Sequence, residues 1–259
     1  NCSLGPDKIK GIVDEFLNYS DLPVIVKPNA GLPDPRTGEY TMNAEDFAEY
    51  MKEFYENGVS VMGGCCGTSP EYIRLLKNTL ETVEKGTPEK VKGCVISGVN
   101  EAVVLNEPRI IGERINPTGK KRFKQALEEN DLDYILNEGL SQVEAGAEIL
   151  DVNVGHSAID EKEMMRSVVC SLQGSIGLPL QLDSTSPEVL ENALRVYTGK
   201  AIINSVNGEE KSLNTVLPIV KKYGAAVVGL TLDERGIPET AEERVEIAEK
   251  IINRATEMG

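Results

Sequence analysis

Residues 145–154 of this 259-residue chain read AGAEILDVNV, a glycine turn followed by a short apolar segment that ends in aspartate and asparagine. Apolar runs of about four to eight residues, bounded by turn residues, are typical of strands buried on both faces. The segment predicts a strand over residues 148–154, with helices at about 132–145 before it and 160–173 after it. A parallel sheet covered by helices is the fold that this order favours.

The same alternation recurs along the chain. Predicted strands span residues 22–27, 59–62, 110–115, 148–154, 179–183, 201–206 and 225–231. Predicted helices cover about 9–17, 43–57, 70–85, 120–129, 132–145, 160–173, 187–197, 212–223 and the segment from 240 onward. Counted generously, about eight strand-helix units suit one (β/α)8 barrel. Residues 86–108 interrupt the repeat with only short β-like pieces, at 94–96 and 102–105, which we interpret as a linker that contains a hairpin. This interruption favours two separate α/β parts.

Composition limits the class of ligand. The chain has 40% hydrophobic and 27% charged residues and a net charge of −15, so it is a globular protein without the basic surface that nucleic acid or anionic membrane requires. A small molecule or another protein is the expected partner. No apolar run has the length of a membrane span and no signal segment opens the chain, which predicts a cytoplasmic protein. Because the chain starts at Asn1, we expect it to be an excerpt of a longer protein.

Cysteines mark the first candidate site. Residues 63–68 (GGCCGT) lie between a predicted strand and a predicted helix, and Cys2 precedes the first predicted helix. Three thiolates at about 2.3 Å from Zn²⁺ leave one position for a substrate, which is the arrangement of a catalytic zinc site. The alternative is that these cysteines are small buried apolar residues, which is the commoner role of a lone cysteine. The adjacent pair in a glycine frame favours zinc.

These residues resemble a known family. Asn1-Cys2-Ser3, residues 63–68 and residues 27–31 (KPNAG) are similar to the homocysteine methyltransferase family, which folds as a (β/α)8 barrel. The resemblance covers about the last third of that barrel. It implies that Cys2, Cys65 and Cys66 bind zinc and are the catalytic residues that activate the thiolate of homocysteine.

Polar side chains at strand ends mark a second candidate site. Residues 110–119 (IIGERINPTG) end a predicted strand, and later strands end in Asp151 with Asn153, in Asp183 and in Asn204. Aspartate and asparagine are poor strand formers, so four such endings do not serve sheet stability. A group of carboxylates and amides can recognise a flat polar heterocycle. Helix capping is the alternative for each of them singly.

This second group is similar to the pterin-binding family, which includes dihydropteroate synthase and the methyltetrahydrofolate methyltransferases. The forms GERINPTG and DVN are closer to the methyltransferases. The resemblance covers roughly the first five of eight barrel strands. It implies a folate site in which Asp183 and Asn204 bind the pterin ring, Asn116, Asp151 and Asn153 line its pocket, and Gly119, Lys120 and Lys121 approach the folate.

The order of the two resemblances implies a fold and a function for the chain. The fold is α/β of the (β/α)8 TIM-barrel type, with the C-terminal part of a zinc barrel over residues 1–86, a linker over 87–108 and the N-terminal part of a folate barrel over 109–259. The implied activity moves the methyl group of 5-methyltetrahydrofolate, through cobalamin on a separate domain in the same protein or in trans, to zinc-activated homocysteine. Two alternatives remain open: a dihydropteroate-synthase-like enzyme, or a binding fragment without catalysis. His156, the only histidine, is interpreted as a solvated loop residue.

Overall fold

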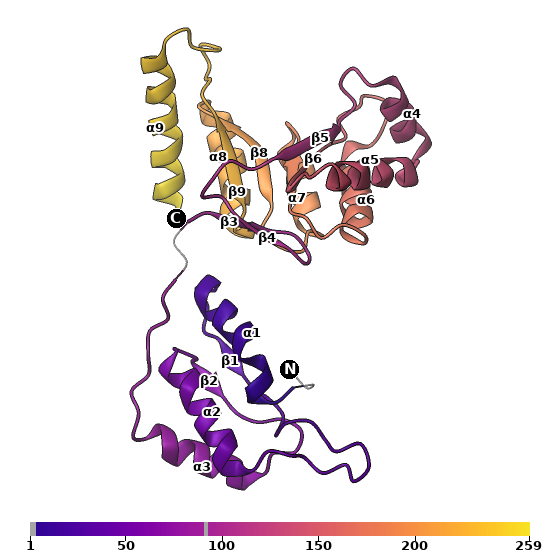
Figure 1. Cartoon of the computed structure of the whole chain (residues 1–259). Helices are drawn as coiled ribbons and strands as arrows, with labels where there is room; N and C mark the ends of the chain where they lie inside the picture. Colours follow the sequence, from indigo (N-terminus) through magenta and orange to yellow (C-terminus); the bar gives the residue numbers. More distant parts are fainter. Residues whose placement is uncertain (1–3, 91–92) are drawn as a thin grey trace. The chain divides into compact units, whose positions relative to one another are not determined.

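The computed structural model describes residues 4–90 and 93–259, so Cys2 lies outside the described residues. The chain divides into two compact units, Asn1–Lys92 and Gly93–Gly259. Figure 1 draws the first unit in indigo to purple and the second in darker magenta through orange to yellow. Each unit has its own hydrophobic core.

The first unit is a small parallel α/β structure. Its two short strands pair in register, Ile25 with Val61 and Val26 with Met62. The large buried side chains Phe47, Met51 and Phe54 come from one face of the second helix and fill the core. The elements are α1 (Pro6–Tyr19), β1 (Ile25–Val26), α2 (Ala44–Glu56), β2 (Val61–Met62) and α3 (Pro70–Leu80).

Helix α3 is shorter than the sequence predicts. The apolar period favours a helix over 70–85, but α3 ends at Leu80. Thr82 donates its hydroxyl to the carbonyl of Thr79 at 2.9 Å in a turn that replaces the continuing helix. Side chains branched at Cβ, such as Thr82 and Val83, lower helix propensity. The prediction is therefore wrong by about one turn.

The second unit contains a five-stranded, all-parallel sheet in which each strand neighbours the next one along the chain, β5-β6-β7-β8-β9. This sequential order, with helices between the strands, is the arrangement of (β/α) barrels and confirms the predicted fold type. The strands are β5 (Ile111–Ile115), β6 (Ile149–Asn153), β7 (Leu180–Asp183), β8 (Ile202–Asn207) and β9 (Ala226–Leu230). The helices are α4 (Lys121–Glu129), α5 (Leu132–Glu144), α6 (Glu161–Gln173), α7 (Pro187–Leu194), α8 (Glu210–Tyr223) and α9 (Ala241–Met258).

The two faces of this sheet differ because side chains alternate along each strand. Leu150, Val152, Leu182 and Ile203 belong to the main core with residues of the covering helices. The alternate positions form the other face, which is apolar near the amino ends of the strands and polar toward their carboxyl ends. The polar positions are Asp151, Asn153, Gln181, Asp183 and Asn204.

An antiparallel hairpin, β3 (Val95–Ser97) with β4 (Ala102–Val104), packs on the apolar end of that face. Its Ile96 is fully buried in a small cluster with Ile149 and Ile202. Residues 93–108, which the sequence places in a linker, therefore include a hairpin that packs within the second unit. In the described part of the chain, no helix combines the length and apolar character that crossing a membrane requires.

Candidate functional site

The two adjacent cysteines lie in the loop between β2 and α3. Cys65 Sγ and Cys66 Sγ are 4.0 Å apart. Two thiolates that share one tetrahedral zinc ion at about 2.3 Å are separated by about 3.8 Å, so the observed spacing fits two ligands of one metal. Within residues 4–90 and 93–259, no group of three or more metal-binding side chains comes together. The predicted third ligand, Cys2, is outside those ranges.

Backbone and amide hydrogen bonds hold the cysteine loop. Asn29 Oδ1 accepts a hydrogen bond from Cys66 N at 3.2 Å, and Cys66 O accepts one from Ala30 N at 2.9 Å. Asn29 is only 4% exposed, and its own N–H donates to the carbonyl of Leu4 at 3.0 Å. Asn29 therefore connects the start of the described chain with the loop that presents the cysteines.

A tight backbone turn follows the pair. Gly67 has φ +80°, a conformation that side chains with Cβ rarely adopt, and a Cβ at this position would lie 2.2 Å from the ring of Tyr40. Gly67 thus allows the chain to turn against Tyr40 immediately after the thiols.

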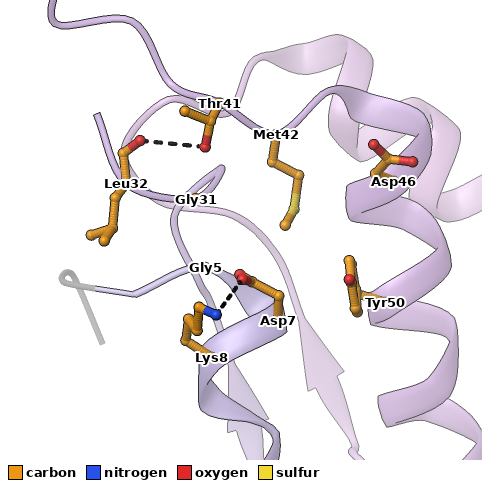
Figure 2. A pocket seen from close by; sticks show the side chains of 9 residues that line it. All are labelled: Gly5, Asp7, Lys8, Gly31, Leu32, Thr41, Met42, Asp46 and Tyr50. Atoms are coloured by element: carbon orange, nitrogen blue, oxygen red, sulfur yellow. Dashed lines mark hydrogen bonds and ion pairs between the residues drawn. The ribbon is translucent and has the colours of Figure 1, made fainter. Parts of the chain in front are cut away.

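A hollow of about 450 Å³ lies in the same unit, between the start of α1, the segment around Gly31 and the first turns of α2 (Figure 2). Asp7 and Lys8 form an ion pair at 3.6 Å on one wall, and Asp46 and Tyr50 of α2 form the other. Neither Cys65 nor Cys66 lines it. The two described cysteines of the predicted zinc site are therefore not part of its lining.

The second unit brings four of the predicted folate residues together. Asn153 pairs in register with Asp183, and Asp183 pairs with Asn204 on the next strand. Asn153 Nδ2 donates to Asp183 Oδ2 at 2.9 Å. Asp151 lies on the same face, in the middle of β6, while Asn153 and Asp183 are the last residues of β6 and β7. This edge of a parallel α/β sheet is where ligands bind in such folds.

Asp151 is the buried member of this group, with 4% exposure. Burial raises the pKa of its carboxyl, and the negative charges of Asp183 and Glu113 raise it further, against hydrogen bonds from Gln181 and Asn204. Gln181 Nε2 donates to Asp151 Oδ1 at 2.5 Å. Sequence analysis missed Gln181, although the alternation in Leu180-Gln181-Leu182-Asp183 places it on the polar face.

We expect Asp151→Asn to stabilise the folded chain at neutral pH. A raised folded-state pKa means that ionising Asp151 costs folding free energy, so its contribution is favourable in acid and is lost as pH rises through the folded pKa. The free energy of unfolding of the variant should therefore match the wild type near pH 3.8 and exceed it at pH 7. Urea unfolding at both pH values measures this, with the exposed Asp133→Asn as control. A variant less stable than wild type at pH 7 would contradict it.

The remaining residues predicted for the folate site lie in the loop after β5 and at the first position of α4. Asn116 Oδ1 accepts from Thr118 N at 2.8 Å, and Gly119 has φ +72°. Lys120 Nζ lies 3.2 Å from the carbonyl of Glu113 and also contacts its carboxylate, so this ammonium is held at the end of β5. Lys121 is exposed. Lys120 and Lys121 are adjacent in the sequence, but the ammonium of Lys120 contacts Glu113 whereas the side chain of Lys121 is exposed.

His156 is less exposed than a solvated loop residue, with 15% of its side chain accessible. Its Nδ1 accepts from Ala158 N at 3.2 Å, and its Nε2 lies 3.5 Å from Glu128 Oε1. The interpretation as a solvated side chain is wrong because the loop folds back on the ring and α4 supplies a carboxylate partner.

Comparison with known families divides the chain in the same way as its two units. Residues 1–80 match the family described as homocysteine S-methyltransferase, and residues 112–259 match that described as pterin binding enzyme. The second match covers more than half of the chain. The chain belongs to the pterin binding enzyme family. Its polar strand ends are therefore in a domain of a pterin-binding kind, as the sequence predicts.

Curated relatives extend over both units. The chain is 34% identical to methionine synthase of Mycobacterium tuberculosis (strain ATCC 25618 / H37Rv), over 99% of this chain and 22% of that protein. It is also 34% identical to methionine synthase of Mycobacterium leprae (strain TN), over 99% of this chain and 23% of that protein. The chain thus spans less than a quarter of the length of these relatives.

Solved structures with a similar fold include dihydropteroate synthases. That of Xanthomonas albilineans with 4-aminobenzoic acid has 24% identity and a TM-score of 0.47, over 63% of this chain and 60% of that chain. That of Thermus thermophilus in complex with 6HMPPP has 22% identity and a TM-score of 0.47, over 64% of this chain and 61% of that chain.

Proposed function

We propose that this chain contributes two substrate sites to a 5-methyltetrahydrofolate–homocysteine methyltransferase, the cobalamin-dependent type of methionine synthase. The observation that carries the proposal is the order of the two family matches, homocysteine S-methyltransferase followed by pterin binding enzyme, in a chain 34% identical over 99% of its length to methionine synthases. Either match alone leaves several enzymes possible. Their combination requires one ligand that gives a methyl group and one that receives it.

The first unit would hold zinc and the acceptor. Cys65 and Cys66, with their sulfur atoms 4.0 Å apart, supply two thiolates, and Cys2 is the proposed third ligand. Asn29 fixes the loop through Cys66 N, which keeps both thiols at the end of β2. Bound zinc would favour the thiolate form of the homocysteine sulfur near neutral pH, because a coordinated thiol loses its proton readily.

The second unit would hold the methyl donor. Asp183 and Asn204 offer acceptors and a donor to the edge of a pterin ring, while Asp151, Asn153 and Asn116 line the pocket beside them. The hydrogen bond from Asn153 to Asp183 orients that carboxylate before a ligand arrives. A half-buried acceptor that is already oriented loses little freedom on binding, which favours affinity.

Cobalamin has no residues assigned to it in this chain. We propose that it is carried by a separate domain, in the same protein or in trans, which visits each site in turn. The reaction proposed for the cell is cytoplasmic methionine synthesis, with homocysteine and methyltetrahydrofolate as ligands.

The dihydropteroate-synthase-like alternative is less favoured. It explains the pterin match of residues 112–259 but gives no role to the homocysteine S-methyltransferase match of residues 1–80. The thiols of residues 63–68 would also be without a purpose in a condensation of a pterin with an arylamine.

Exogenous cobalamin tests the proposal on the 259-residue chain. We expect methyl transfer from 5-methyltetrahydrofolate to reduced cobalamin, measured by its absorbance, at a rate that Asp183→Ala lowers at least tenfold and Cys66→Ser leaves unchanged. The exposed Asp133→Ala is the control for removal of one carboxylate. Turnover of a pterin pyrophosphate with para-aminobenzoate, without methyl transfer, would contradict the proposal and support the alternative.

A further inference from the structure

Gln181 is a buried polar side chain of β7 that has no role in the pterin site as proposed above. It is 7% exposed, and its Nε2 donates to Asp151 Oδ1 at 2.5 Å. Its neighbours Leu180 and Leu182 point to the main hydrophobic core. A buried amide costs folding free energy unless it is hydrogen-bonded, so an apolar residue would suit the strand better at this position. The contact with Asp151 is therefore the feature that needs a functional explanation.

The strand register arranges the polar side chains of this face in two layers. Asn153, Asp183 and Asn204 are partners in register and form the upper layer, toward the carboxyl ends of the strands. Asp151 and Gln181 are partners two residues earlier and form the lower layer. A ligand at the carboxyl ends of the strands meets the upper layer first, so Gln181 acts on the site from below.

The surroundings of the lower layer are apolar on the side away from the site. Ile149 precedes Asp151 by two residues on β6, and Ile202 is the register partner of Gln181 on β8. Both isoleucines are buried in one cluster with Ile96 of the hairpin. Because this side offers no hydrogen bond, the carboxylate of Asp151 depends on donors beside it and above it.

The charged groups that face Asp151 oppose its ionisation. Asp183 on β7 and Glu113 on β5 are both anionic, and together with burial they raise the pKa of Asp151, whereas hydrogen bonds from Gln181 and Asn204 lower it. Asn204 can donate to a carboxylate only through Nδ2, since Oδ1 is an acceptor. The hydrogen bond to Asp151 therefore fixes which end of this amide faces the carboxylate and leaves Oδ1 to accept from a ligand.

We propose that Gln181 is a positioning residue of the pterin site, which holds Asp151 as the acceptor that orients the amide of Asn204. Protonated Asp151 carries a donor of its own, so it no longer fixes this orientation. By stabilising the ionised carboxylate, Gln181 extends the oriented state of Asn204 to lower pH. This inference rests on the proposed function, because it assumes that Asn204 contacts the pterin.

Two substitutions at position 181 should change the pH dependence of folate binding in opposite directions. Gln181→Met removes the donor at similar side-chain length, so binding of 5-methyltetrahydrofolate should weaken about tenfold near about pH 6 and less near about pH 8.5, where Asp151 is ionised without help. Gln181→Glu keeps the shape, and in acid one proton shared with Asp151 replaces the amide donor. This variant should bind as the wild type does near about pH 6 and about tenfold more weakly near about pH 8.5, where two adjacent carboxylates repel each other.

Calorimetric titration of the 259-residue chain measures these affinities, each expressed relative to wild type at the same pH. The relative value removes the protonation of the ligand itself, which is common to all proteins. Gln125→Met, at an exposed position of α4, is the matched control and should bind as the wild type does at both pH values. Circular dichroism checks folding, and the relative affinities of Gln181→Glu decide the result if Gln181→Met does not fold.

The outcomes separate this inference from the proposed function. A merely structural role of Gln181 would weaken binding equally at both pH values. Relative affinities that do not change with pH would therefore overturn the inference and leave the proposed function standing. A wild-type chain that does not bind 5-methyltetrahydrofolate would overturn both.

Discussion

Asp183→Ala is expected to weaken binding of 5-methyltetrahydrofolate at least about a hundredfold. A carboxylate that accepts two hydrogen bonds from a ligand contributes about 1.5–3 kcal/mol through each bond, and about 1.4 kcal/mol corresponds to a tenfold change in affinity. The substitution also removes the acceptor of the 2.9 Å hydrogen bond from Asn153, which would leave that amide without its orienting partner. Isothermal titration of wild type and variant at one salt concentration measures the change.

Two further variants make this result interpretable. Asp183→Asn keeps the shape of the side chain and one acceptor, and we expect a loss between those of Asp183→Ala and the wild type. Asp133→Ala removes an exposed carboxylate from α5 and should bind folate as the wild type does. Circular dichroism establishes that each variant folds. An Asp183→Asn protein that is folded and binds with unchanged affinity would remove Asp183 from the pterin site.

The second unit is the part of the fold that its sequence predicts best. The predicted strand 179–183 corresponds to β7, and the predicted start of the last helix at Thr240 corresponds to a capping box with Glu243. Both signals are local: a buried parallel strand is apolar along its length, and a capping box needs only four residues. The β-like pieces predicted at residues 94–96 and 102–105 correspond to β3 and β4 of the hairpin, but strands of three residues each are too short for an alternating pattern to predict which face of the sheet they cover.

For the candidate site, the sequence predicts the residues themselves but not the residues that they contact. Asp151, Asn153, Asp183 and Asn204 could be named from the sequence because polar residues are unusual at the ends of buried strands. The partners of these residues could not, since Gln181 meets Asp151 only through the register between β6 and β7. Sequence alone also treats neighbouring lysines as equivalent.

Tertiary contacts make the environments of Lys120 and Lys121 different, and they also hold the cysteine loop in place. Lys120 is held by Glu113, whereas Lys121 is exposed, and this difference depends on how α4 follows the end of β5. Asn29, 37 residues before Cys66 in the chain, supplies the side-chain acceptor for its N–H. Residues 27–31 resemble the homocysteine methyltransferase family in sequence. The separation of Asn29 and Cys66 along the chain, however, does not predict the hydrogen bond between them.

Loss of zinc from Cys65→Ser and Cys66→Ser is the second large expected effect. The sulfur atoms of the pair are 4.0 Å apart, a separation that two thiolates on one zinc ion can adopt. Changes to groups that only orient metal ligands cost about 10–100-fold in metal affinity, so removal of a ligand should cost more than about a hundredfold. Zinc analysis after dialysis should find about one ion per wild-type chain and almost none in either variant.

The exposed Cys94 supplies the matched control, because Cys94→Ser removes a thiol from the second unit and should retain the zinc. Zinc that binds only the folded chain also raises its thermal midpoint by mass action, so added zinc should raise the midpoint of wild type and Cys94→Ser but not of Cys66→Ser. This second measurement distinguishes a metal bound in the folded loop from metal bound loosely to any thiol. Equal zinc content in Cys66→Ser and Cys94→Ser would show that the adjacent pair is not a metal site. It would also contradict the proposal that the first unit binds zinc and the methyl acceptor.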